Sequence, residues 1–160
     1  MKLGIVGTGN MGKAILNGLL DNVLKTQDII CVDKSQESLD RIAKAYQVVC
    51  SAEISAIKDC DVVLLAVKPQ NMDEVLPLMG KVISEKTLII SIAVGITSSF
   101  IVNNLGINKA GVFGIALITA ALLIPRFFTM KLEVIPTAIE MIKVFSEITL
   151  PIKGKTSSIF

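Results

Sequence analysis

The residues best suited to a chemical function form a glycine-rich run near the start of the chain, which reads Gly7-Thr8-Gly9-Asn10-Met11-Gly12. It follows a short apolar run at residues 3–6 and precedes residues 13–20, whose apolar side chains recur with helical spacing. Between a strand and a helix, G-x-G-x-x-G is typical of phosphate binding, because the glycines allow a tight turn, a close backbone approach and close helix packing. The helix N-terminus adds free N–H groups and a positive dipole end. We therefore predict that these six residues bind the pyrophosphate of a dinucleotide.

A second set of candidate residues follows the next predicted strand, residues 28–32. Asp33 stands at its end, where an acidic side chain can accept hydrogen bonds from the ribose hydroxyls of NAD. Lys34 and Ser35 come next and could instead hold the 2′-phosphate of NADP, although Lys34 could equally be a solvated turn residue. The signals point to different cofactors, so the sequence leaves NAD or NADP open. Ser35 is also a good N-cap for the helix that follows.

A third set lies at the carboxyl end of the most hydrophobic predicted strand, residues 61–67, and consists of Ala66, Val67, Lys68 and Pro69. Ligands of open α/β sheets bind at that edge, so the backbone here could contact a nicotinamide ribose. A simple strand-ending turn is the alternative. Residues 91–95 end the next predicted strand, 87–92, and their small side chains would leave room for a nicotinamide ring.

Strands and helices alternate along the first two thirds of the chain. The remaining elements that we expect are a short strand at 48–49, a weak helix at 53–57, a helix at 72–82, and a helix through 101–105 capped by Thr97. This order predicts an α/β fold with a doubly wound, mostly parallel, Rossmann-like sheet and right-handed crossovers. We place a dinucleotide-binding domain at 1–106, and an atypical apolar and helical remainder at 107–160.

The composition excludes several kinds of chemistry. The chain has no histidine, which removes Ser-His-Asp, Cys-His and histidine-ligated metal chemistry. Cys31, Cys50 and Cys60 show neither disulfide nor zinc spacing, so we expect no metal and a reducing compartment. The net charge of +2 without a basic cluster argues against a nucleic-acid partner. Asp59 and Asp61 are expected to cap or solvate a turn, and no residue can be assigned as catalytic.

The hydrophobic content raises the question of a membrane, because the mean hydropathy is +0.68. The most apolar stretch, residues 110–124, is shorter than the roughly 20 residues that span a bilayer. We interpret it as a buried strand or helix, and residues 138–148 as an amphipathic helix. The apolar run at the N-terminus is too short for a signal peptide, so we expect no membrane attachment and a cytoplasmic protein.

Three strings together resemble pyrroline-5-carboxylate reductases, and they lie at residues 4–12, 61–70 and 88–96. The Ala-Val-Lys-Pro-Gln string at 66–70 is the most specific of the matching features, and the resemblance extends over about residues 1–105. It implies hydride transfer from NAD(P)H to the C=N bond of 1-pyrroline-5-carboxylate, giving proline in proline biosynthesis. It also implies a small-molecule substrate and, in the full-length family, a homo-oligomer built through a helical domain.

Two departures from this family stand out. Glu53 occupies a position where the family usually has an asparagine that helps to hold the nucleotide. The family also continues with an Arg-x-Met-Pro-Asn-Thr-Pro motif and a helical domain with Ser/Thr- and Gly-rich segments, and these motifs are not found in residues 107–160, although residues 138–148 again resemble the family's next helix. A displaced reading frame between about Lys109 and Pro136 is one hypothesis, because shifted codons there can encode part of that motif. A genuine short variant and a decayed gene product are the others.

These departures leave three functional interpretations. The first is a reductase of the pyrroline-5-carboxylate kind, reduced in this short form to its cofactor domain and not necessarily active. The second is a nucleotide-binding remnant without catalysis. The third is another small reductase, of a 6-phosphogluconate- or F420-linked type. All three predict cofactor binding, so only turnover separates them.

Overall fold

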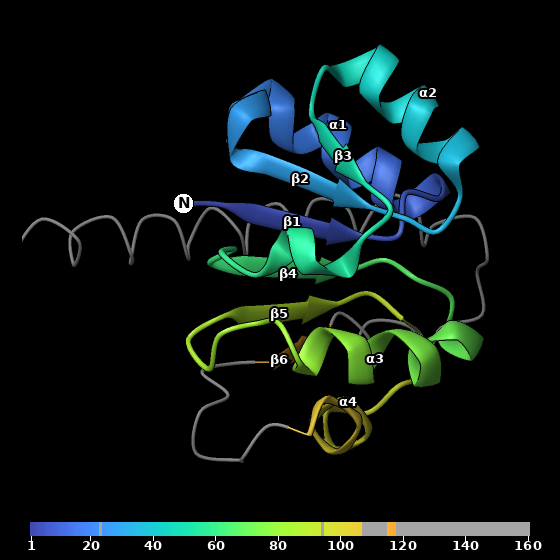
Figure 1. Ribbon diagram of the computed structural model, residues 1–160, viewed down its shortest axis with the longest axis vertical. Coiled ribbons are helices and arrows are strands. Elements are labelled where there is room, and N and C mark those ends of the chain that lie inside the picture. The colour runs from blue at the N-terminus through green and yellow to red at the C-terminus, as the bar shows by residue number, and fades with distance from the viewer. Residues whose placement is uncertain (23, 94, 107–114, 118–160) are drawn as a thin grey trace, which may run out of the picture.

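A computed structural model describes residues 1–22, 24–93, 95–106 and 115–117. The helix expected at 138–148 lies outside these residues, and so does nearly all of the segment between Lys109 and Pro136. Strands and helices alternate along the described chain (Figure 1). The strands are β1 (Leu3–Val6), β2 (Ile29–Val32), β3 (Val49–Ser51), β4 (Val62–Leu65), β5 (Leu88–Ser91) and β6 (Ile115–Leu117). The α-helices are α1 (Asn10–Asn22), α2 (Gln36–Tyr46), α3 (Met72–Gly80) and α4 (Ser98–Leu105), and short 3₁₀ turns occupy η1 (Thr26–Asp28), η2 (Ile54–Ile57) and η3 (Pro69–Asn71).

The strands form one sheet in the order β3-β2-β1-β4-β5-β6, and every neighbouring pair is parallel. The order reverses direction at β1, which pairs with β2 on one side and β4 on the other. This is the doubly wound, Rossmann-like α/β sheet that the alternation of elements predicted. β6 extends it with three residues from the segment beyond residue 106, where we had placed the end of the dinucleotide-binding domain.

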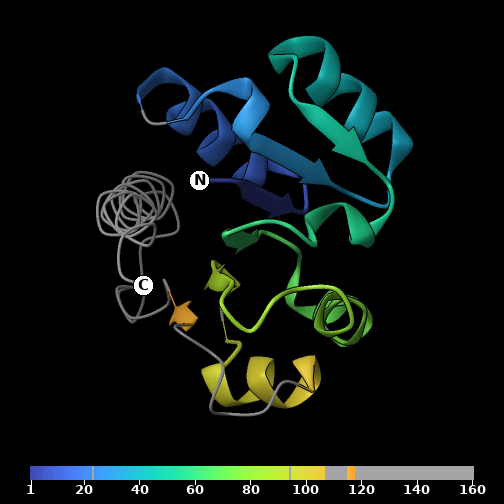
Figure 2. The ribbon, with the colours of Figure 1, turned by 60° about the vertical axis from the view of Figure 1, so that its left-hand side comes forward.

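Two hydrophobic cores hold the layers together, one on each face of the sheet. Successive residues of a strand point to opposite faces, so Leu3 and Ile5 enter one core while Val6 enters the other. The first core contains residues of α1 and α2, and the second contains residues of α3 and α4. Figures 1 and 2 show the pairs α1–α2 and α3–α4 on different sides of the strands. Because both faces are covered, the central strands β1 and β4 are fully buried, which explains their continuous apolar sequence.

Local sequence signals set several of the helix ends. Ser35 precedes α2, and its hydroxyl accepts a hydrogen bond from the Ser38 N–H at 3.3 Å. Thr97 precedes α4 in the same way, with its hydroxyl accepting from Phe100 N–H at 3.2 Å. Both predicted caps are confirmed. Each satisfies one of the N–H groups that the first turn of a helix leaves without an intrahelical partner.

Tertiary pairing shortened or moved other elements. β4 ends at Leu65 because its partner β1 ends opposite it, at Val6. The weak helix expected at residues 53–57 is the 3₁₀ turn η2. α1 begins at Asn10, inside the glycine-rich run rather than after it. Among the described residues, none of the helices has the length and apolar character needed to cross a bilayer.

Candidate functional site

The turn after β1 depends on glycine at its first position. Gly7 has a φ of +98°, in the left-handed region where other residues are strained. A Cβ added there would lie 2.7 Å from the carbonyl oxygen of Ala66. The Gly7 N–H donates to the Val32 carbonyl at 2.8 Å, so the turn is held between the ends of β2 and β4.

The other two glycines of the motif face different surroundings. A Cβ on Gly12 would collide with the carbonyl oxygen of Gly7 and approach the Cβ of Ala66 at 3.3 Å, so this glycine lets α1 pack tightly on the turn. A Cβ on Gly9 would meet no heavy atom within 4 Å. Gly9 also accepts the first hydrogen bond of α1 through its carbonyl, from Lys13 N–H at 2.9 Å. Gly9 therefore stands at the N-terminus of a helix and faces open space.

Asp33 connects the end of β2 to this turn. Its Oδ2 accepts hydrogen bonds from the N–H and the hydroxyl of Thr8, at 2.7 and 2.8 Å, and its Oδ1 accepts from the Ser35 N–H at 3.0 Å. Burial alone raises the pKa of Asp33, but these bonds and one from the Lys34 backbone outweigh burial and lower it below its usual value. The side chain is consequently an ionised carboxylate held in one position at neutral pH.

These groups border a pocket of about 420 Å³ at the carboxyl ends of β1, β2 and β4. The ends of the three strands supply one wall. The glycine turn, the segment before η2, η2 itself, η3 and helix α3 supply other parts, including the apolar side chains of Ile54, Val75 and Leu78. Ligands of doubly wound sheets bind where the strand order reverses, outside the carboxyl ends of the strands. The pocket lies at that position.

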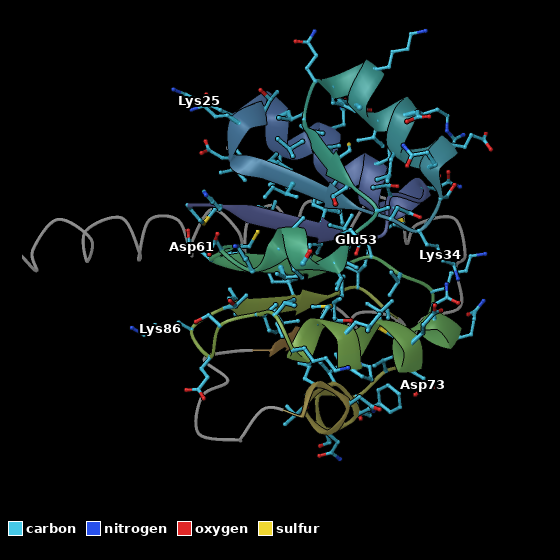
Figure 3. The ribbon with its side chains drawn as sticks, viewed as in Figure 1. Lys25, Lys34, Glu53, Asp61, Asp73 and Lys86 are labelled. Atoms are coloured by element: carbon cyan, nitrogen blue, oxygen red, sulfur yellow. The ribbon has the colours of Figure 1, made fainter. Side chains whose placement is uncertain are left out.

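Charged side chains of both signs line the pocket. The acids are Asp33, Glu53 and Glu74, and the bases are Lys34 and Lys68. Lys34 Nζ lies 3.6 Å from Glu74 Oε2, which joins the loop after β2 to the first turn of α3. Figure 3 shows Lys34 and Glu53 near the arrowheads of the strands, whereas Lys25, Asp61 and Lys86 lie at the other end of the sheet.

The structure brings together about half of the residues that we predicted for the site. Those that line the pocket are Gly7, Gly9, Asp33, Lys34, Ala66, Val67 and Lys68. The others support it or lie beside it. Three of them support the site: Thr8 is buried against Asp33, Gly12 packs under the turn, and Ser35 caps α2. The other three lie beside it: Asn10 is exposed at the start of α1, Met11 packs on the first core, and Pro69 is exposed in η3.

The opposite wall of the pocket was missed by the sequence analysis. Asn71, Glu74, Val75 and Leu78 come from η3 and α3. A signal was available, because α3 starts a few residues after the carboxyl end of β4 and its first turn must therefore lie at the same edge. The described residues of the stretch at 91–95, which was expected near a nicotinamide ring, do not border this pocket, and the Ser91 hydroxyl accepts a hydrogen bond from Ala93 N–H at 3.3 Å.

The cysteines lie away from this site. Burial and the neighbouring Cys50 raise the pKa of Cys31 to about 12, and burial is the main cause that raises the pKa of Cys60 to about 11. Asp61 accepts a hydrogen bond from Lys2 N–H at 2.8 Å, at the edge of the sheet opposite the pocket. Within the described residues, no group of His, Cys, Asp or Glu side chains could hold a metal ion.

The comparisons with known proteins agree with this geometry. Residues 2–95 match the family model described as NADP oxidoreductase, coenzyme F420-dependent. The chain belongs to this family. A pyrroline-5-carboxylate reductase of Pseudomonas aeruginosa is 32% identical over 96 residues, which cover 59% of this chain and 35% of that protein. The resemblance to the N-terminal NAD(P)-binding domain of these reductases is thus confirmed, and the chain spans about a third of the length of this curated relative.

Solved structures show the same relationship. A pyrroline-5-carboxylate reductase of Coxiella burnetii has 30% identity and a TM-score of 0.62, covering 66% of this chain and 40% of its own. The enzyme of Plasmodium falciparum, whose structure has NADP bound, has 24% identity and a TM-score of 0.56 over 66% of this chain and 38% of its own. At that identity the second likeness shows the fold alone.

Proposed function

We propose that this chain binds a nicotinamide dinucleotide in the pocket at the carboxyl ends of β1, β2 and β4. The observation that carries this proposal is the open face of Gly9, at the N-terminus of α1 and on the border of the pocket. A helix N-terminus with an uncovered backbone is suited to a pyrophosphate, because free N–H groups and the helix dipole both favour negative charge. Any side chain at Gly9 would occupy this space.

The rest of the pocket suits the other parts of such a cofactor. Asp33 is an ionised acceptor at the end of β2, where the adenosine ribose of a dinucleotide is held in this fold. The apolar side chains of Ile54, Val75 and Leu78 can flank a flat base. Ala66 and Val67 follow the neighbouring strand β4, and their backbone would face the nicotinamide half.

We also propose that the protein to which this chain corresponds reduces the C=N bond of 1-pyrroline-5-carboxylate to give proline. The likeness to pyrroline-5-carboxylate reductases supports this assignment over the cofactor-binding part. A bound nicotinamide would supply a hydride to the carbon of the C=N bond, and the nitrogen would gain a proton. The described residues would bind and orient the cofactor, and we assign none of them as catalytic.

The chain by itself is expected to bind cofactor but not to reduce pyrroline-5-carboxylate, because it lacks the family motif that we expect after residue 106. Without a held substrate, the reaction loses orientation of the two reactants, which can be worth about 7–11 kcal/mol. Calorimetric titration with NADH and NADPH tests cofactor binding. A steady-state assay that follows NAD(P)H loss with pyrroline-5-carboxylate tests turnover. Turnover of about one per second or faster, within the range of ordinary enzymes, would contradict the expected inactivity.

A second function is favoured by the description of the matching family, which names coenzyme F420 rather than an imine substrate. An F420-linked reductase would use the same pocket for the dinucleotide and place a different partner at its nicotinamide end. Oxidation of NADPH with oxidised F420, but not with pyrroline-5-carboxylate, would favour this alternative. Cofactor binding without turnover of either substrate is the result that we expect of this chain alone, and a non-catalytic binding module would behave in the same way.

A further inference from the structure

We propose that the pocket selects NADH over NADPH, and that Glu74 is a specificity-determining residue because its ion pair holds Lys34 away from a 2′-phosphate. This inference rests on the proposed cofactor site. It also resolves the conflict between Asp33, which favours NAD, and Lys34 and Ser35, which would suit NADP. The deciding contacts come from α3 and from the glycine turn, and neither could be read from residues 33–35 alone.

The position of Asp33 is the first part of the argument. In a pocket that accepts NADPH, an acid at the end of β2 would have to turn away from the additional phosphate or become protonated. Asp33 can do neither easily, because Thr8 and Ser35 hold both of its oxygens with bonds of 2.7–3.0 Å. Those bonds also lower its pKa, so the carboxylate stays charged. Placing a phosphate dianion beside this charge should weaken binding about tenfold or more, even in a well-solvated site.

The lysine and the backbone donors next to Asp33 are already engaged. Lys34 pairs with Glu74 across the mouth of the pocket, at 3.6 Å. Ser35 donates its N–H to Asp33, and its hydroxyl caps α2 by accepting from Ser38 N–H. Glu53 adds a further acid to the lining. The part of the pocket beside Asp33 is therefore acidic, because Lys34 is paired with Glu74 and Lys68 follows β4, two strands away from β2.

The ion pair contributes less to selection than Asp33 does. Lys34 and Glu74 are 73% and 65% exposed, and exposed pairs are worth at most about 1 kcal/mol, or roughly fivefold in affinity. We therefore expect Glu74→Gln, which releases Lys34, to strengthen NADPH binding roughly twofold to fivefold and to change NADH binding by a smaller factor, because NADH lacks the 2′-phosphate. Asp73 is the matched control, because this acid precedes Glu74 in the first turn of α3, is exposed and does not line the pocket (Figure 3).

The test is a set of calorimetric titrations of the full chain with NADH and with NADPH. It compares the unaltered protein, Glu74→Gln and Asp73→Asn at one ionic strength, because surface electrostatics depend on salt. We expect the unaltered protein to bind NADH about tenfold or more tightly than NADPH. Glu74→Gln should narrow the ratio of the NADPH and NADH dissociation constants, and Asp73→Asn should leave this ratio as it is. Asp33→Asn, checked for folding by thermal unfolding, should narrow it further.

The outcomes separate the two proposals. If neither dinucleotide binds, the cofactor site itself is wrong. If both bind with equal affinity to the unaltered protein, the site stands and the selection of NADH is overturned. If NADH is preferred but Glu74→Gln matches Asp73→Asn, Asp33 accounts for the preference and the role of Glu74 is overturned. A narrowed ratio in Glu74→Gln alone supports the inference.

Discussion

Substituting valine at Gly9 tests the proposed site most directly, because the structure separates its effect on binding from its effect on folding. The side chain would project into open space on the border of the pocket, since nothing lies within 4 Å of a Cβ there. A phosphate oxygen bound to a backbone N–H lies at about 2.9 Å, and a contact stretched to about 3.6 Å is no longer a hydrogen bond. Bulk at Gly9 should therefore displace the pyrophosphate beyond this limit.

The magnitude follows from the bonds that would be lost. Hydrogen bonds to charged groups contribute about 1.5–3 kcal/mol each, so losing one or two should weaken dinucleotide binding by about ten- to a hundredfold or more. Stability should change little. Gly9 is not in the left-handed region, so a side chain adds no backbone strain there, and we expect a loss of only about 1 kcal/mol because valine is a poorer N-cap for α1 than glycine.

The assay combines calorimetric titration with urea unfolding for the unaltered protein, Gly9→Ala and Gly9→Val. Gly12→Ala is the contrasting variant, because its Cβ would collide with the Gly7 carbonyl, and it should lose about 1–3 kcal/mol of stability. Equal affinity for the dinucleotide in a folded Gly9→Val protein would refute the proposed position of the pyrophosphate. A large loss of stability in the same variant would show that the space at Gly9 is not open.

Three further predictions concern groups whose environment the structure defines. Because the pKa of Asp33 is lower in the folded protein than in the unfolded chain, its carboxylate stabilises the protein above the pH range where it titrates in the unfolded chain. The free energy of unfolding should therefore fall below about pH 4, and it should fall less steeply in Asp33→Asn. Urea midpoints measured across this pH range would show the difference. Timed alkylation of the native protein, followed by mass spectrometry, should modify half-exposed Cys50 before buried Cys31 and Cys60, whose thiols have strongly raised pKa values; early loss of either buried thiol would contradict the packing. Gly80→Ala should lower the free energy of unfolding by about 1–3 kcal/mol, because its Cβ would collide with the carbonyl of Leu105 at the end of α4, and an unchanged urea midpoint would refute this close approach.

Much of the fold could be predicted from the sequence because local patterns depend on local physics. A short continuous apolar run between strand and helix signals, such as residues 62–65, is typical of a parallel strand buried on both faces. Ser35 and Thr97 mark helix starts because a hydroxyl at that position can accept a hydrogen bond from the first turn. The glycine spacing also predicted the turn at Gly7, and the left-handed φ found there explains why a glycine is needed.

The tertiary structure alone decided which interactions the candidate residues make with one another. The sequence placed Asp33 and Thr8 in one site but could not show that they bond to each other, because the bond joins loops that follow different strands. It also gave no reason to connect Lys34 with Glu74, which come together only because β2 and α3 reach the same edge of the sheet. Residue types and spacing therefore determined the kind of ligand that we propose. The packing of α3 against the strands determined the charges that this ligand would meet, because side chains from distant parts of the chain become neighbours only when the layers assemble.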